Sequence, residues 1–137
     1  MRHITLKREA RERAAAPVRD ALRERVGRCE VCGTPKMPND LAVHEIANGP
    51  LRVKAIDKLF AVLVVCRLPN FRKQTDCHRE VQEWPEPKQL ALLYMRRSAD
   101  YDLTAYLTLT NPRAMQRITQ SEVDEQIQIL LAGRATK

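Results

Sequence analysis

Four cysteines in two pairs are the residues of this chain best suited to chemistry. The stretch CEVC places Cys29 and Cys32 three positions apart, so both thiolates can face one tetrahedral ion. Cys66 and Cys77 are separated by ten residues, and a loop of that length can return the second thiol to the first. Four thiolates around one Zn²⁺ form a closed structural site, which is the arrangement we predict. Four ordinary buried thiols, or a zinc site completed by a histidine, are the alternatives.

Three further side chains lie close to the cysteines in sequence: His44, Glu45 and His78. If the four thiols take one ion, these three stay available for other chemistry. His44 and Glu45 fall on a predicted strand, and His78 opens a predicted helix directly after Cys77. A strand and a helix tied by one ion can converge their side chains on a second point. We therefore expect a second cation there, with open coordination positions.

Local patterns predict the elements that carry these residues. An apolar run at 59–66 and the shorter LAVHEI at 41–46 are typical of strands, with ANGP as the turn that closes the latter. The segment LPNFRKQTD at 68–76 is a polar loop, and a helix begins at Cys77 and ends before two prolines. Helical spacing over 5–26 is interrupted by Pro17, which indicates two helices or one kinked helix.

The C-terminal third is predicted to be helical and structural. KQLALLYMRR has helical apolar spacing, and Asp102 can cap the helix that follows it. Asn111 followed by Pro112 is typical of a further helix start. TQSE at 119–122 matches a capping box, and Gly133 is expected to end the last helix.

Charge and composition favour a polyanion as the partner. The chain has 137 residues, a net charge of +7 and an isoelectric point near 9.6. Such a balance attracts nucleic acid, whereas 4% aromatic residues argue against a platform for stacked bases. No run approaches the roughly 20 apolar residues that span a bilayer, and the first residues lack the apolar core of a secretory signal. We expect a cytoplasmic protein with no membrane partner, in which cysteines bind metal and do not form disulfides.

The order of these parts resembles the HNH endonucleases of the ββα-metal, or His-Me finger, family, in their four-cysteine zinc-binding form. The resemblance is carried by CEVC, VHEI, LVVC and DCHREV, and covers roughly residues 29–83. It implies an α+β fold with a small ββα-metal core and a four-cysteine zinc site, flanked by an N-terminal helix and a C-terminal helical extension. The corresponding divisions are a basic helical segment at 1–28, the core at 29–84 and a packing region at 85–137.

The resemblance also implies a nuclease site. His78 matches the metal-binding histidine, and the catalytic cation would be Mg²⁺ or Mn²⁺. The hairpin can be aligned in two registers: His44 is the metal ligand with Glu45 as general base, or His44 is the base and Val43 stands where a ligand belongs. The middle asparagine of the family falls on Ala61. Phosphate contacts are expected from basic residues in the loop and on the helix, namely Arg67, Arg72, Lys73 and Arg79.

Three functions remain open on this reading. The first is an HNH-like endonuclease that cleaves or nicks DNA, in the host cytoplasm if it is phage-encoded, with other phage or host proteins as further partners. The second is a catalytically degenerate zinc protein of the same fold that acts as a DNA-binding or regulatory module. The third is a protein-interaction domain in which zinc only stabilises the fold.

Overall fold

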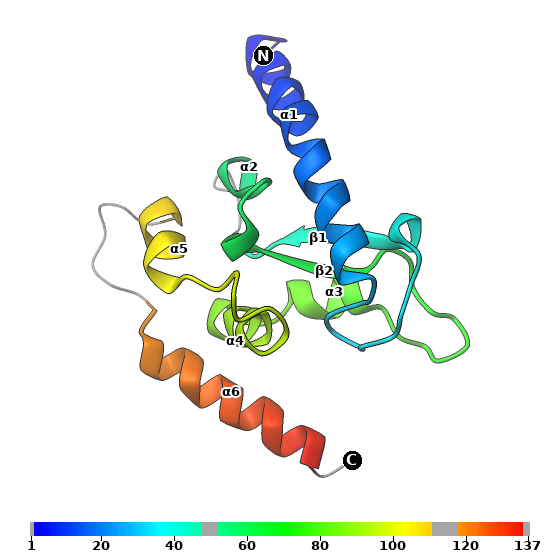
Figure 1. The fold of residues 1–137 in the computed structure, drawn as a ribbon, viewed down its shortest axis with the longest axis vertical. Helices are drawn as coiled ribbons and strands as arrows, with labels where there is room; N and C mark the ends of the chain where they lie inside the picture. Colours follow the sequence, from blue (N-terminus) through cyan, green and yellow to red (C-terminus); the bar gives the residue numbers. More distant parts are fainter. Residues whose placement is uncertain (1, 48–51, 111–117, 136–137) are drawn as a thin grey trace.

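The structure, a computed structural model, describes residues 2–47, 52–110 and 118–135. Helices surround a two-stranded antiparallel sheet at the centre of the molecule (Figure 1). The class is therefore mixed α+β, as predicted. In chain order the elements are α1 (Arg2–Val26), η1 (Pro38–Asp40), β1 (Leu41–Glu45), α2 (Arg52–Ala55), η3 (Leu59–Ala61), β2 (Val62–Cys66), α3 (Cys77–Gln82), α4 (Glu86–Arg96), α5 (Leu103–Thr110) and α6 (Gln120–Ala135).

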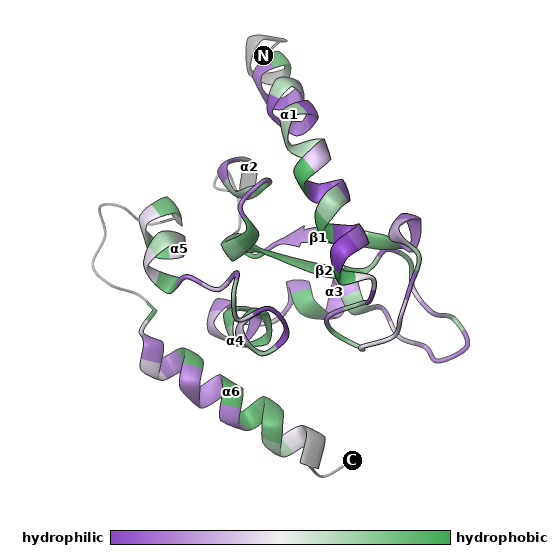
Figure 2. Cartoon of the chain, in the orientation of Figure 1, coloured by the Kyte–Doolittle hydropathy of each residue, from purple (hydrophilic) through white to green (hydrophobic). Residues whose placement is uncertain are grey.

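The sheet holds the centre of the core. β1 pairs with β2 so that Leu41 lies opposite Cys66 and His44 lies opposite Leu63. Every residue of β2 is buried, and this strand is the most uniformly apolar part of Figure 2. The prediction for β1 is confirmed apart from one residue at its end. The prediction that β2 starts at residue 59 is wrong, because 59–61 form a 3-10 turn closed by the Ala61 N–H on the Lys58 carbonyl.

Helix α1 continues through its proline. Pro17 lies inside one helix of 25 residues, so of the two predicted alternatives, two helices or one kinked helix, the structure has the single helix. A proline removes one backbone donor and crowds the preceding turn, which typically costs about 3 kcal/mol. The buried side chains of Ala15 and Leu22 lie on either side of Pro17, so core packing holds the helix together at this point. The half of α1 nearer the N-terminus stands away from the body of the protein (Figure 1).

The C-terminal helices pack in layers on the sheet. α4 contacts β2, and α6 lies along the far side of α4 (Figure 1). The capping box is confirmed: the Glu122 N–H donates to Thr119 Oγ1 at 3.1 Å, and the Thr119 N–H donates to Glu122 Oε1 at 3.3 Å. Asp102 caps α5 through the Ala105 N–H at 3.0 Å, as predicted.

Two further predictions concern a helix end at Gly133 and a helix start at Asn111. Gly133 does not end the last helix, because α6 continues to Ala135. The predicted helix start at Asn111 and Pro112 lies outside the described residues, as does most of the ANGP turn. Across the part of the chain that the structure describes, none of the helices combines the length and the apolar character that crossing a bilayer requires.

Candidate metal centre and the adjacent histidine pair

The four cysteines come together at one point, as predicted. Their Sγ atoms all lie within 4.8 Å of one another, and Cys32 Sγ lies 3.7 Å from Cys66 Sγ. Cys29 and Cys32 come from a tight turn before β1, Cys66 is the last residue of β2, and Cys77 is the first residue of α3. The long loop at 67–76 thus brings Cys77 back to Cys66, as the spacing of the second pair allows.

The turn that holds the first pair depends on glycine. Gly33 has φ = 77°, a conformation that side chains rarely adopt, and its N–H donates to the Cys29 carbonyl at 2.8 Å. The Cys29 N–H donates to the Thr34 carbonyl at 3.0 Å, which closes the turn from the other side. The Cys32 N–H points at Cys29 Sγ, 3.4 Å away. The backbone therefore already directs a donor to a sulfur that would carry negative charge.

The cluster has the dimensions of a tetrahedral thiolate site. With Zn–S bonds of about 2.3 Å, a regular tetrahedron separates the sulfurs by about 3.8 Å. The 3.7 Å between Cys32 and Cys66 meets this value, and none of the separations in the cluster exceeds it by more than about one ångström. The four cysteines are thus positioned to bind one metal ion.

The pKa values of the thiols show that several negative charges cannot lie together here without a cation. Burial, with the neighbouring Cys29 as the next cause, raises the pKa of the Cys66 thiol to about 12. Burial and the charges of Cys29 and Cys32 raise the pKa of Cys77 strongly. At Cys32 burial acts in the same direction, but hydrogen bonds to Thr34 outweigh it and lower the pKa to about 7. Four thiolates this close repel one another unless a positive ion lies among them.

Glu30, the residue between the first cysteines, anchors their turn to the core. Its N–H donates to the Val64 carbonyl at 2.7 Å, and its Oε1 accepts from the Val64 N–H at 2.8 Å. Its Oε2 accepts from Arg97 Nε at 2.8 Å, and its own carbonyl accepts from Arg96 Nε at 2.8 Å. Strand β2 and the end of α4 therefore both hold the cysteine turn in place.

His44 and His78 converge beside the thiol cluster. Their ring centroids lie 5.4 Å apart, with the planes nearly perpendicular at 76°. β1 carries His44 and the first turn of α3 carries His78, directly after the thiol of Cys77. Asp76 fixes that first turn, because its side chain accepts from the Arg79 N–H at 3.3 Å. The predicted convergence of the two imidazoles is therefore present.

A third polar side chain, that of Gln89, completes this group. Gln89 Oε1 lies 2.8 Å from His44 Nε2, and Gln89 Nε2 donates to the Trp84 carbonyl at 2.8 Å. Gln89 is buried on α4, and His44 is 6% exposed. The histidine pair is thus held from the α4 side by an amide that is itself held in place.

Glu45 is directed elsewhere. Neighbouring residues of a strand point to opposite faces, so Glu45 lies on the other side of β1 from His44. There it pairs with Arg19 of α1 at 3.7 Å. Arg19 also donates to the Val43 carbonyl at 2.8 Å and to the Ile56 carbonyl at 3.0 Å. One guanidinium therefore bridges β1 and the segment that follows α2.

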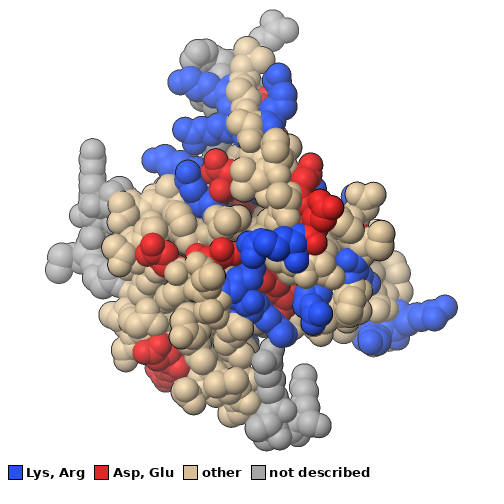
Figure 3. Space-filling model, viewed as in Figure 1, with Lys and Arg blue, Asp and Glu red and all other residues tan. Residues whose placement is uncertain are grey.

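The predicted phosphate contacts lie on the loop before α3 and at its start. Arg67, Arg72, Lys73 and Arg79 are all exposed. The Asn70 side chain accepts from the N–H groups of Arg72 and Lys73 at 3.1 and 3.2 Å, and a bridge to Thr75 closes the loop. Lys and Arg side chains gather along α1 and at the outer end of this loop in Figure 3. The loop is thus a folded basic projection.

Sequence reasoning missed four residues of this region: Arg19, Glu30, Gln89 and Arg97. Each makes at least one contact with a segment far away in the sequence. Glu30 gave a local signal, since the negative charge of a carboxylate between two metal-binding cysteines needs a positively charged partner when it is buried.

Comparison of the chain with protein-family models, with curated proteins and with solved structures found no significant match.

Proposed function

We propose that this protein is an HNH-like endonuclease that cleaves or nicks DNA with a divalent cation, and that zinc holds its ββα-metal core together. The observation that carries the proposal is the convergence of His44 and His78 beside the thiol cluster. The chain order of β1, β2 and α3, with α2 and η3 between the two strands, is compatible with the core that the family resemblance implies and supports the proposal. Net charge of +7 and the basic loop supply the attraction to a polyanion.

Zinc is the ion we assign to the four cysteines. Four thiolates at tetrahedral spacing, with none of the positions left to water, are typical of structural zinc. The ion would join the turn at Cys29, the end of β2 and the start of α3. These elements carry or support His44 and His78. The ion would therefore hold the two imidazoles in position without taking part in the reaction.

The two imidazoles divide the catalytic work. A divalent cation, when bound, stabilises charge on the scissile phosphate and the leaving oxygen. His78, on the first turn of α3, would hold that cation. His44 accepts the proton of the attacking water, because an imidazole changes its protonation near neutral pH. Glu45 takes no part, since it lies on the opposite face of β1 and pairs with Arg19.

The family resemblance leaves one role unfilled, and Arg19 fits it. The middle asparagine that orients the hairpin falls on Ala61, which is buried and has no polar side chain. Here the Ile46 N–H donates to the Ala61 carbonyl at 2.9 Å. Arg19 adds its bonds to Val43 and Ile56, so a side chain from α1 braces the strand that carries His44. The missing asparagine is therefore compatible with an ordered catalytic strand.

One observation favours a second candidate, a DNA-binding module that does not cleave. His44 is 6% exposed, so a water molecule and a phosphate must reach a ring that is largely covered. A protein of this kind would bind DNA through the same basic loop and keep the zinc.

Cleavage of supercoiled plasmid by the pure zinc-loaded protein tests the first candidate against the second. Nicked or linear product with Mg²⁺ or Mn²⁺ is expected, and His44→Ala and His78→Ala should each lose it. The matched control is His3→Ala, which removes the remaining histidine of the chain, at the start of α1. Salt-sensitive DNA binding without cleavage, in the wild-type protein, would establish the DNA-binding module instead.

A further inference from the structure

The loop between β2 and α3 projects from one side of the molecule (Figure 1). At its tip, Phe71 is 86% exposed, the highest value among the large apolar side chains of the described residues. Leu68 of the same loop is 64% exposed, whereas the other phenylalanine of the chain, Phe60, is partly buried against the core. Isolated apolar side chains are common on protein surfaces, but two on one loop with a polar rim are typical of a contact surface.

The backbone of the loop fixes the aromatic ring in this exposed position. Asn70 and Thr75 exchange both of their backbone hydrogen bonds, at 2.7 and 3.1 Å, so only the four residues between them form the tip. The Asn70 side chain accepts from the N–H groups of Arg72 and Lys73 at 3.1 and 3.2 Å. Gln74 turns the chain back with φ = 53°, a conformation that side chains rarely adopt. A tip held by this many internal bonds does not have to become ordered when a partner binds.

Cations flank the ring. Arg72 and Lys73 follow Phe71 directly in the sequence, and Arg67 lies at the base of the same loop. Among the ion pairs of the described residues, none involves these three side chains, so their charges are available to a partner. An apolar centre with a positive rim is complementary to duplex DNA, in which phosphates flank a stack of base pairs.

The ends of the loop place it beside the candidate site. Cys66 precedes the loop and Cys77 follows it, and both belong to the thiol cluster. His78 comes directly after Cys77, on the first turn of α3. At the base of the loop the Arg67 N–H donates to the Asp40 carbonyl at 2.9 Å, which joins the loop to the segment before β1. A duplex held at the tip can therefore extend to the histidine pair.

We propose that Phe71 is a wedge that enters between neighbouring base pairs of duplex DNA, while Arg72 and Lys73 hold the phosphates beside it. The inference rests on the proposed function and deepens it, because it names the substrate as a duplex that can be opened at one base step. Exposed phenylalanine and leucine side chains part base steps and kink the duplex in proteins that bind the minor groove. One ring suffices for a wedge, whereas a platform for several stacked bases needs more aromatic residues than this chain has.

A wedge makes binding depend on how easily the duplex opens. Pyrimidine–purine steps such as TA unstack readily, and A-tracts are stiff. We therefore expect tighter binding to a duplex with a central TA step than to one with a central A-tract, although no side chain has to read the bases. Phe71→Ala should remove that preference.

Unstacking can be measured without cleavage, on zinc-loaded protein with no Mg²⁺ or Mn²⁺. A fluorescent adenine analogue beside the TA step brightens when its base unstacks, and we expect wild-type protein to raise its emission. Phe71→Ala should leave the emission at the level of free DNA and weaken binding to the TA duplex roughly 10-fold, as expected for the loss of one aromatic contact with a base. The dependence of binding on salt should stay unchanged, because the variant removes no charge.

Two controls accompany this variant. Ile129→Ala removes an exposed apolar side chain from α6 and should behave as the wild type. Circular dichroism and zinc content of Phe71→Ala should match those of the wild type, because the ring has almost no contact with the core.

The wedge and the nuclease fail independently. Wild-type binding without unstacking, or unstacking that persists in Phe71→Ala, overturns the wedge and leaves the nuclease proposal standing. Unstacking that depends on Phe71, in a protein that never cleaves DNA, supports the wedge and counts against the nuclease. An aromatic ring among cations also fits an anionic membrane surface, so vesicles of phosphatidylserine are tested in parallel. Vesicle binding that Phe71→Ala abolishes, with DNA binding unchanged, would assign the tip to a membrane and overturn the proposal.

Discussion

Glu30 and Arg97 lie 67 residues apart in the chain and form a buried ion pair with 2.8 Å between Glu30 Oε2 and Arg97 Nε. Their side chains are 2% and 5% exposed. Arg97 also donates to the carbonyls of Leu59 and Val62 and to Asp100. The turn that carries the first two cysteines is therefore joined to the end of α4 by an ion pair. Both of its charged groups have further hydrogen-bond partners.

Removing one member of this pair should destabilise the protein severely. Arg97→Met leaves the carboxylate of Glu30 buried without its partner, and breaking a buried pair in this way typically costs about 3–5 kcal/mol. The free energy of unfolding in urea, measured with zinc present, should fall by that amount. Arg8→Met is the control, since its pair with Glu12 is more than half exposed and should contribute at most about 0.5 kcal/mol. Equal losses in the two variants would contradict the role given to Arg97.

Substitution of a cysteine should release the metal and unfold the surrounding core. Cys77→Ser removes the thiol that joins α3 to the other three ligands, and binding of a structural ion is coupled to folding. Metal analysis should show about one zinc per wild-type chain and far less in the variant. Circular dichroism should show loss of structure in the variant, and in the wild type after chelation. Full structure after complete removal of zinc would contradict the coupling.

Zinc affinity should fall as the pH falls. In the metal-free protein the pKa of Cys66 is raised to about 12 and that of Cys77 is raised further, so both thiols are protonated at neutral pH. Each must lose its proton when the ion binds, so acid favours the metal-free state. A competition titration between about pH 8 and pH 6 should show Kd rising with each step down. A Kd independent of pH would exclude thiolates as the ligands.

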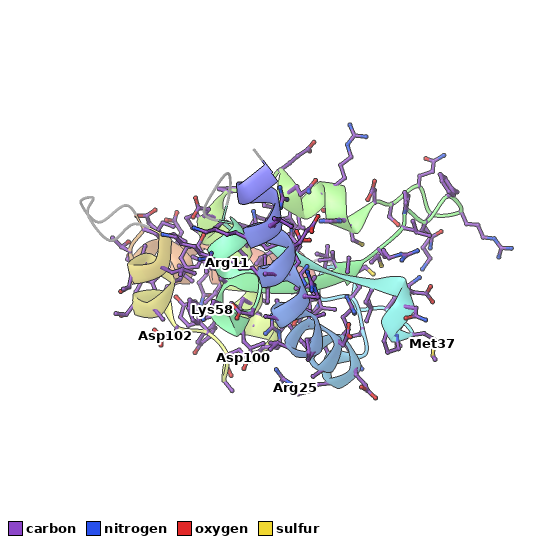
Figure 4. The ribbon with its side chains drawn as sticks, turned by 90° about the horizontal axis from the view of Figure 1, so that it is seen from above. Arg11, Arg25, Met37, Lys58, Asp100 and Asp102 are labelled. Carbon is purple, nitrogen blue, oxygen red and sulfur yellow. The ribbon has the colours of Figure 1, made fainter. Side chains whose placement is uncertain are left out.

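Asp100 should contribute stability that disappears in acid. Burial acts to raise its pKa, but hydrogen bonds and charge from Arg25 and Arg97 outweigh burial and lower the pKa below the ordinary 3.8. Because the folded pKa is the lower one, the contribution is complete above the unfolded pKa and vanishes as the pH falls through the folded pKa. Figure 4 labels Asp100 and Arg25, whose charged atoms lie 2.8 Å apart.

The measurement is the difference in unfolding free energy between wild type and Asp100→Asn across the acid range. Protonation of the zinc-binding thiols affects both proteins alike, so the difference isolates this carboxylate. We expect it to be constant near neutral pH and to shrink towards acid. A difference that grows on acidification would reverse the sign of the assigned pKa shift.

DNA binding should depend on salt through the basic loop. Each neutralised phosphate contributes about 0.9 to the slope of log K against log salt concentration on duplex DNA. The double variant Arg72→Ala, Lys73→Ala should therefore reduce that slope by about 1.8, with anisotropy of labelled duplex as the readout. Lys88→Ala serves as control, because that lysine packs on the Trp84 ring. A slope unchanged by the double variant would remove the loop from the interface.

Local signals predicted many of the elements. The capping box at Thr119 and the cap at Asp102 act within three or four residues, and both form as expected. Local signals left other points open or decided them wrongly. Pro17 allowed either two helices or one kinked helix, and the buried side chains of Ala15 and Leu22 on either side of it favour the single helix. Gly133 was expected to stop α6, yet a glycine inside a helix costs only about 1 kcal/mol.

The spacing and type of the cysteines determined the thiol cluster from sequence alone, because a two-residue turn and one loop bring the pairs together. They also indicated the convergence of His44 and His78, which follow from the same elements. Only the tertiary structure decided which groups support them. Gln89 meets His44 across 45 residues, and Arg97 meets Glu30 across 67. A buried polar group needs a hydrogen-bond partner. Which partner it has depends on how distant elements pack together, and the local sequence pattern does not contain that information.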